Sequence, residues 1–139
     1  MLNFLKKKDI TTKVKILIVD DETDYVQTVQ DMLEISNYSV ISAHNGKQAL
    51  NIIPQQQPDV ILLDLIMPVM DGIELLKRLK SNPEFKNIPV IMLTGQSELG
   101  DVARAQECGV DDYIVKPFDR NLLLEKIKQV IEKARKVHN

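Results

Sequence analysis

The sequence predicts an α/β fold, a doubly wound five-stranded parallel sheet flanked by five helices. Two observations lead to this prediction: short apolar runs alternate five times with longer amphipathic stretches, and polar or charged residues follow each short run. Continuous runs of branched apolar residues are typical of buried strands. Strands that alternate with helices along a chain assemble into parallel sheets with both faces covered.

The apolar runs give the predicted strands, which cover residues 14–19, 38–43, 60–63, 89–93 and 112–115. The run at 60–63 is the most hydrophobic, as expected of a central strand. Apolar side chains at helical spacing mark the five helices: Val26, Val29, Met32 and Leu33; Ala49, Leu50, Ile52 and Ile53; Ile73, Leu76 and Leu79; Leu99, Val102, Ala103 and Ala105; and Leu123, Ile127, Val130, Ile131 and Ala134.

Helix boundaries follow from local residue chemistry. Thr23 or Asp24 is available to cap the first helix. Asn45-Gly46 predicts a turn before the second helix, and Pro54 is expected to limit that helix because proline removes a backbone donor. The fourth helix, at about residues 98–108, is weakly apolar, and the glycine at position 109 can close it.

Length and composition are those of one domain. The chain has 139 residues, and we expect a domain over residues 14–136 after a polar leader at 1–13. No apolar stretch approaches the roughly 18 to 20 residues that a membrane span needs. The start is too short for a signal sequence, and the single cysteine, Cys108, fits a reducing compartment, so a cytoplasmic location is the expectation.

Charge is distributed unevenly. Residues 1–15 and 116–139 each carry a net charge of +4, whereas residues 16–115 carry −10. Few aromatic residues accompany the basic ends, so stacking on nucleic-acid bases has little support, and solvated basic faces are the preferred interpretation.

Polar residues gather where the predicted strands end. Asp20 and Asp21 follow the first strand, Asp64 the third, Thr94 the fourth and Lys116 the fifth. In doubly wound sheets the site lies at the carboxyl ends of the strands, so these side chains are expected to meet. Three neighbouring carboxylates repel one another unless a cation lies among them, and such oxygen ligands suit Mg²⁺. A nearby lysine suits a phosphoryl group, which points to phosphoryl chemistry on an aspartate.

Several motifs occur in order along the chain. They are Ile18-Val19-Asp20-Asp21, Leu63-Asp64, Met67-Pro68, Asp71-Gly72, Leu93-Thr94-Gly95 and Tyr113-Ile114-Val115-Lys116-Pro117-Phe118. With these motifs the chain resembles the response-regulator receiver domains of two-component signalling and is similar to the single-domain chemotaxis type. The resemblance spans about residues 14–135 and implies the flavodoxin-like receiver fold.

The resemblance assigns roles to the acidic residues. It implies that Asp64 accepts the phosphoryl group and that Asp21 and Asp64 ligate Mg²⁺ together with the backbone carbonyl of Ile66. Asp20 is expected to reach the metal through water. Where the family commonly has a polar residue, position 66 is isoleucine. An apolar side chain there is expected to hinder hydrolysis and to prolong the phosphorylated state.

The resemblance also implies a switch. Thr94 and Lys116 are expected to contact the phosphoryl oxygens, and the bond from Lys116 to the following proline is expected to be cis. Thr94 can move toward the new acceptor, which frees volume for Tyr113. The weakly packed helix at 98–108 is the expected mobile element, because little apolar burial holds it.

These inferences predict a phospho-accepting signalling switch rather than a turnover enzyme, with slow loss of its own phosphoryl group. The expected donor is a histidine kinase or a histidine phosphotransfer protein. The expected target is a downstream protein that binds the face formed by residues 98–108, 112–115 and the last helix. Neither a membrane nor nucleic acid is an expected direct partner, and a dimer that forms on phosphorylation is compatible with the sequence.

Five alternatives compete with this prediction. The paired acids at 20 and 21 could merely cap the first helix. An aspartate-nucleophile phosphatase would need a second acid at position 66, and a nucleotide enzyme would need a glycine-rich motif that the chain lacks. A binding-only receiver would not accept phosphate. The chain could also be the receiver of a longer regulator with a DNA-binding or enzymatic output, although a stand-alone receiver is the preferred reading.

Overall fold

A single parallel sheet with strand order β2-β1-β3-β4-β5 organises the computed structural model, which describes residues 13–67 and 70–138. Its strands are β1 (Lys15–Val19), β2 (Ser39–Ala43), β3 (Val60–Asp64), β4 (Val90–Thr94) and β5 (Asp112–Val115). All neighbouring strands pair in parallel. From β1 the chain adds β2 on one side and then β3, β4 and β5 on the other. This reversal confirms the predicted doubly wound sheet.

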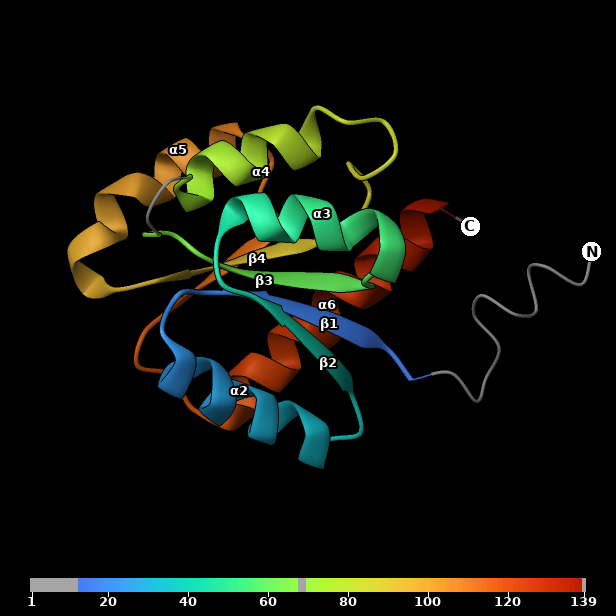
Figure 1. Ribbon diagram of the computed structural model, residues 1–139, viewed down its shortest axis with the longest axis vertical. Coiled ribbons are helices and arrows are strands. Elements are labelled where there is room, and N and C mark those ends of the chain that lie inside the picture. Colours follow the sequence, from blue (N-terminus) through green and yellow to red (C-terminus); the bar gives the residue numbers. More distant parts are fainter. Residues whose placement is uncertain (1–12, 68–69, 139) are drawn as a thin grey trace, which may run out of the picture.

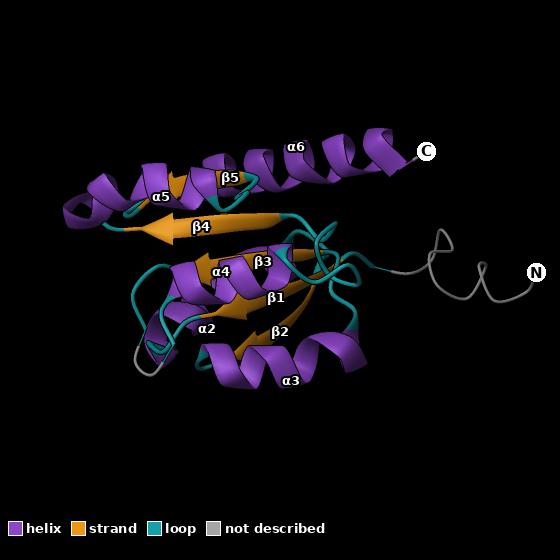
Figure 2. Cartoon of the chain, turned by 90° about the horizontal axis from the view of Figure 1, so that it is seen from above, coloured by secondary structure: helices purple, strands orange, loops and turns teal. Residues whose placement is uncertain are grey.

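Helices cover both faces of the sheet (Figure 1). One face carries α3 (Gly46–Gln56), α4 (Gly72–Lys80) and α5 (Val102–Glu107). The other face carries α2 (Thr23–Ile35) and α6 (Arg120–His138), and Figure 2 shows α6 alongside β5. None of these helices, within the part of the chain that the structure describes, is long and apolar enough to cross a membrane.

Alternation along the central strands divides the core into two halves. Leu17 and Leu63 are fully buried under α3, α4 and α5, whereas Ile18 and Leu62 are fully buried against α2 and α6. Successive side chains of a strand point to opposite faces, so a strand buried on both faces must be apolar throughout. All five residues of β3 and of β4 are buried, which explains why these runs were readable in the sequence.

Two strands extend one residue beyond their predicted ends. Asp64 belongs to β3 and pairs with Leu93, and Thr94 belongs to β4 and pairs with Val115. A polar residue at a strand end keeps its backbone pairing when its neighbours continue the ladder. The backbones of Asp64 and Thr94, two of the predicted site residues, are therefore fixed by strand pairing.

The start of α2 differs from the prediction. The cap is Glu22 rather than Thr23 or Asp24, and among the described residues no side chain caps this helix. The Glu22 amide donates instead to Oδ1 of Asp20 at 2.9 Å. This bond closes the turn one residue earlier than local preference indicates, because the acceptor comes from the strand end.

The boundaries of α3 also differ from the prediction. Asn45 does not form a separate turn with Gly46 but caps the helix, since its Oδ1 accepts from the amide of Gln48 at 2.8 Å. Pro54 does not end α3, which continues to Gln56. Near a helix end proline removes a single hydrogen bond, and the next turn still closes through the amide of Gln57, which donates to the Ile53 carbonyl at 2.9 Å.

The predicted helix at 98–108 is two elements. A 3-10 helix, η1 (Gln96–Asp101), precedes the short α5. Among the α5 side chains Ala105 alone is buried, so little apolar packing holds a regular helix here. Gly109 closes α5 as predicted, with a φ of +91° that favours glycine. The predicted leader at 1–13 lies outside the described residues except for Lys13.

Candidate functional site

The carboxyl ends of the strands, toward the left in Figure 1, bring the predicted acids together. Asp20 directly follows β1 and is fully buried, and Asp64 at the end of β3 is 7% exposed. Asp21 lies beside them and is exposed. Carboxylate oxygens of Asp20, Asp21 and Asp64 all lie within 4.8 Å of one another. The cluster sits where the strand order reverses, between β1 and β3.

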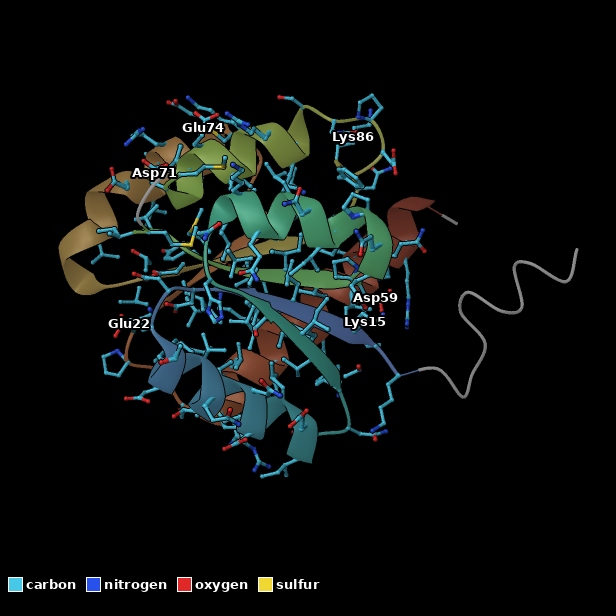
Figure 3. The ribbon with its side chains drawn as sticks, in the orientation of Figure 1. Lys15, Glu22, Asp59, Asp71, Glu74 and Lys86 are labelled. Carbon is cyan, nitrogen blue, oxygen red and sulfur yellow. The ribbon has the colours of Figure 1, made fainter. Side chains whose placement is uncertain are left out.

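Figure 3 labels residues at both ends of the sheet. Glu22 lies at the edge where β1 ends, next to the acid cluster. Lys15 and Asp59 lie at the opposite edge, where the Lys15 amide donates to Oδ2 of Asp59 at 2.8 Å. That second pair ties the start of β1 to the segment before β3, so it supports the fold rather than the acid cluster.

Lys116 brings a positive charge into the cluster. Its Nζ atom lies 3.5 Å from Oδ1 of Asp64 and 3.6 Å from Oδ2 of Asp20. The Lys116 amide donates to the carbonyl of Thr94 at 2.7 Å, which ties the segment after β5 to the end of β4. The peptide bond from Lys116 to Pro117 is cis, as the resemblance implied.

Asp64 is the perturbed titrating group of the site. The pKa of its carboxyl is raised from 3.8 to about 6, first by burial and then by the charge of Asp20. The charge of Lys116 and a hydrogen bond from the Ile66 backbone amide act in the opposite direction. The desolvation of the carboxylate therefore outweighs the single lysine. A further cation would favour the ionised form that a nucleophile requires.

The residues fit a divalent cation. Oδ2 of Asp20 is buried and accepts no hydrogen bond among the described residues, and the Lys116 ammonium 3.6 Å away is shared with Asp64. A buried carboxylate oxygen that accepts no hydrogen bond is costly, so a further cation or an ordered water would stabilise it. Together with Asp21 and Asp64 it forms a hard-oxygen set of the kind that Mg²⁺ prefers.

The start of α4 is pressed against the end of β3. Asp71 caps this helix by accepting from the Glu74 amide at 2.9 Å, and the Gly72 amide donates to the Leu65 carbonyl at 2.8 Å. A Cβ on Gly72 would overlap the carbonyl oxygen of Asp64. Glycine is required at this close approach because any larger side chain would push the helix away from Asp64.

The remaining predicted site residues lie around this centre. Thr94 is buried at the end of β4, and its hydroxyl donates to the Gly95 carbonyl at 3.1 Å. Ile66 has an exposed side chain in the loop after β3. Tyr113 in β5 is partly buried against the α3, α4 and α5 side of the core, outside the acid cluster. The structure thus brings the three acids together, places Lys116 beside Asp20 and Asp64, and places Thr94 on the adjoining strand.

Sequence reasoning missed Tyr25. Its ring centroid lies 4.2 Å from the Nζ atom of Lys116, and it packs edge-on against Phe118, with centroids 6.3 Å apart and rings inclined at 87°. One signal was available, since Tyr25 stands four residues after Asp21, in the first turn of α2 and close in sequence to the acids.

Comparisons with known proteins agree on the family. The family described as "Response regulator receiver domain" matches residues 16–128. The phosphate regulon transcriptional regulatory protein PhoB of Pseudomonas aeruginosa is 41% identical over 119 residues, which are 86% of this chain and 52% of that protein.

Two solved structures illustrate the similarity. A CheY-like response regulator receiver domain protein of Methanospirillum hungatei superposes with a TM-score of 0.83 at 32% identity, covering 90% of this chain and 98% of that one. Chemotaxis protein CheY4 of Vibrio cholerae gives a TM-score of 0.80 at 32% identity, with 86% and 99% covered. By contrast, the chain spans about half the length of the curated relatives that it matches.

Proposed function

The chain belongs to the family of response regulator receiver domains, and on this basis we propose that it is a signalling switch phosphorylated on Asp64. The observation that carries this proposal is the position of Lys116 Nζ, 3.5 Å from Asp64 within a cluster of three carboxylates. One lysine shared by two buried carboxylates leaves a net negative charge in the cluster, which a bound cation and a phosphoryl group can use.

The proposed metal is Mg²⁺, held by Asp21, Asp64 and the backbone carbonyl of Ile66, with Asp20 acting through water. The orphaned Oδ2 atom of Asp20 supports this assignment. When bound, the ion neutralises charge on the carboxylates and on the transferring oxygens.

The proposed step is an attack of a carboxylate oxygen of Asp64 on the phosphorus of a phosphohistidine. The new oxygen–phosphorus bond forms as the phosphorus–nitrogen bond breaks, and the imidazole leaves with the electron pair. The ammonium of Lys116 attracts the transferring oxygens. The product is an acyl phosphate on Asp64, so the domain modifies itself rather than turning over a separate substrate.

The proposed switch begins at Thr94. Its hydroxyl now donates to the Gly95 carbonyl and would turn to the phosphoryl oxygens of modified Asp64. That movement frees space which Tyr113 can enter. The η1 and α5 segment is the element that we expect to respond, because Ala105 alone is buried among the described side chains of α5.

The proposed partners follow from this cycle. The donor is a histidine kinase or a histidine phosphotransfer protein, and the target is a downstream protein that binds the face of α5, β5 and α6. We propose a cytoplasmic location and no direct contact with nucleic acid. Phosphorylation is also proposed to permit dimerisation.

A receiver within a longer regulator is the second candidate. The observation that favours it is the length of the curated relatives, whose names describe transcriptional regulators and of which this chain spans about half. Both candidates use the same phosphorylation chemistry. The preference for a stand-alone receiver stays a prediction.

Mass spectrometry of the intact protein tests the proposal. After incubation with Mg²⁺ and acetyl phosphate we expect one added phosphoryl group, which Asp64→Asn abolishes and Asp31→Asn, an exposed acid on α2, leaves unchanged. Omission of Mg²⁺ should also suppress the adduct. If the wild-type protein accepts nothing from acetyl phosphate or from any histidine donor, the binding-only receiver replaces this proposal.

A further inference from the structure

Tyr25 contacts the lysine of the site through the face of its ring. The side chain comes from the first turn of α2, and its centroid lies 4.2 Å from Nζ of Lys116. We propose that Tyr25 is a positioning residue for phosphoryl transfer, whose ring holds the Lys116 ammonium beside Asp64. This inference rests on the proposed function and extends it by one residue.

Lys116 needs such a support because its side chain is long and flexible. The ammonium lies 3.5 Å from Asp64 and 3.6 Å from Asp20. If the two carboxylates alone held it, they would compete with the phosphoryl group for its three N–H donors. An aromatic ring attracts a cation through its quadrupole without requiring a directed hydrogen bond. The ring can therefore hold the charge while donors stay available for the phosphoryl oxygens.

The ring is held from two separate segments. Its backbone is fixed near the site, because Glu22 at the start of α2 is bonded to Asp20. Its edge packs against Phe118, two residues after Lys116, at 6.3 Å and 87°. Edge-to-face packing of this kind stabilises one ring orientation. Tyr25 thus joins α2 to the segment that carries the lysine.

The hydroxyl of Tyr25 is not the group that acts on Lys116. Its oxygen is buried and has no hydrogen-bond partner within the described part of the chain. Burial and the nearby charges of Asp20 and Asp64 raise the tyrosine pKa, so the ring stays neutral. Phenylalanine offers the same ring face without this unpartnered group, which makes Tyr25→Phe a conservative variant that should keep the positioning role.

A packing role without any effect on the lysine is the competing explanation. A double-mutant cycle with Lys116→Ala separates the two. If Tyr25 acts through Lys116, then Tyr25→Leu slows phosphorylation when Lys116 is present and has little further effect once the lysine is gone. If Tyr25 only packs, its replacement has the same effect in both backgrounds.

The experiment measures the rate of phosphoryl incorporation from acetyl phosphate with Mg²⁺ by intact-protein mass spectrometry. We expect Tyr25→Leu to slow this rate about three- to thirtyfold, the range between an exposed and a desolvated cation–π contact. Tyr25→Phe should stay within about twofold of wild type, and in the Lys116→Ala background Tyr25→Leu should also change the rate less than about twofold. Tyr38→Leu, a partly buried tyrosine beyond the far end of α2, is the matched control and should leave the rate unchanged.

A spectroscopic readout is independent of the reaction. NMR should show the ε-methylene protons of Lys116 shifted upfield by the ring current in wild type and Tyr25→Phe, but not in Tyr25→Leu. Should Tyr25→Leu fail to fold, Tyr25→Met preserves apolar bulk without the aromatic face and replaces it in every arm.

Three outcomes would overturn the inference: equal rates for wild type and Tyr25→Leu, equal losses in Tyr25→Leu and Tyr25→Phe, or an equal effect of Tyr25→Leu with and without Lys116. A wild-type protein that takes no phosphoryl group contradicts the proposed function instead. The ring-current shift then still decides whether Tyr25 holds the lysine.

Discussion

The Asp64 carboxylate is both buried and close to other charged side chains. It is nearly removed from water, stands close to Asp20 and Asp21, and has Lys116 at 3.5 Å. Its pKa rises to about 6 because burial outweighs the lysine. The folded protein without metal therefore holds a proton on Asp64 more tightly than the unfolded chain does. Burial of this carboxyl therefore costs the fold stability at neutral pH, a cost that fits the proposed role of Asp64 as phosphoryl acceptor.

A pH-dependent stability follows from this shift. Between pH 3.8 and about 6, Asp64 is protonated in the folded protein but ionised in the unfolded chain. The stability that this proton binding gives the folded protein is therefore present at low pH and is lost as pH rises through the folded-state pKa. Asp64→Asn should therefore be more stable than wild type at pH 7 by about 1–3 kcal/mol in EDTA, with a smaller difference near pH 4. Urea denaturation at both pH values measures this.

The Asp31→Asn variant is the control for that comparison, because this exposed acid lies outside the cluster. Addition of Mg²⁺ should stabilise wild type more than Asp64→Asn, since a ligand that binds only the folded state raises its stability. If Asp64→Asn differs from wild type by the same free energy of unfolding at pH 4 and at pH 7, burial does not raise the pKa of Asp64.

Ile66 is the residue that should set the lifetime of the phosphorylated state. Its side chain is 59% exposed in the loop after the proposed acceptor Asp64, where we propose that an apolar group hinders a hydrolytic water or an auxiliary catalyst. We expect Ile66→Asn to lose the phosphoryl group several times faster than wild type, with about the same loading rate. Mass spectrometry after removal of the donor follows the decay. A slower decay in the variant would refute the blocking role, and Leu122→Asn, an exposed leucine on α6, is the control.

At the scale of elements, the close approach of α4 to β3 positions Asp64, the proposed acceptor. Gly72 permits this approach because a Cβ there would lie 2.9 Å from the Leu65 Cα atom. Backbone atoms cannot yield as the end of a flexible side chain can, so the helix would have to move.

Gly72→Ala should therefore reduce the free energy of unfolding by about 1–3 kcal/mol and weaken Mg²⁺ binding, because Asp64 ends the strand that α4 abuts. Gly100→Ala is the control, since a Cβ at Gly100 meets no described atom within 4 Å, and should change stability by less than about 0.5 kcal/mol. Denaturant unfolding and magnesium titration measure the two effects. An equally small change in both variants would contradict a tight α4–β3 contact.

The elements also show where local patterns mislead. The strand runs were predicted within one residue, because a strand buried on both faces has to be apolar along its length. The start of α2 was not predicted correctly, because the Glu22 amide donates to the Asp20 carboxylate and no local side chain among the described residues caps the helix. The weakly apolar stretch at 98–108 was identified, but its division into η1 and α5 depends on packing that the stretch itself does not encode.

At the scale of the whole molecule, one sheet serves two cores. Leu62 and Leu63 are adjacent in β3, fully buried and directed into opposite cores. Since both cores share the strands, damage to either should destabilise the entire domain rather than one face.

Leu62→Ala and Leu63→Ala should each reduce stability by about 2–5 kcal/mol, and each variant should unfold in a single transition. Leu122→Ala, at a partly exposed position, should cost much less. Calorimetry and circular dichroism followed together measure this. Separate transitions in either variant would mean that the two cores fold independently.

The sequence by itself determined the order of strands and helices, and with it the edge at which Asp20, Asp21, Asp64 and Lys116 had to meet. This was possible because parallel strands place their carboxyl ends together whatever the details of packing. The family's motifs then indicated what the cluster is for.

Only the tertiary structure decided the contacts of individual side chains. The ring of Tyr25 lies against Lys116 because of how α2 packs beside the segment after β5, and the distance between those residues along the chain conceals the contact. The buried Asp20 oxygen that accepts no hydrogen bond among the described residues and the raised pKa of Asp64 arise in the same way. Burial and orientation depend on neighbours from several elements, so they exist only once the chain has folded.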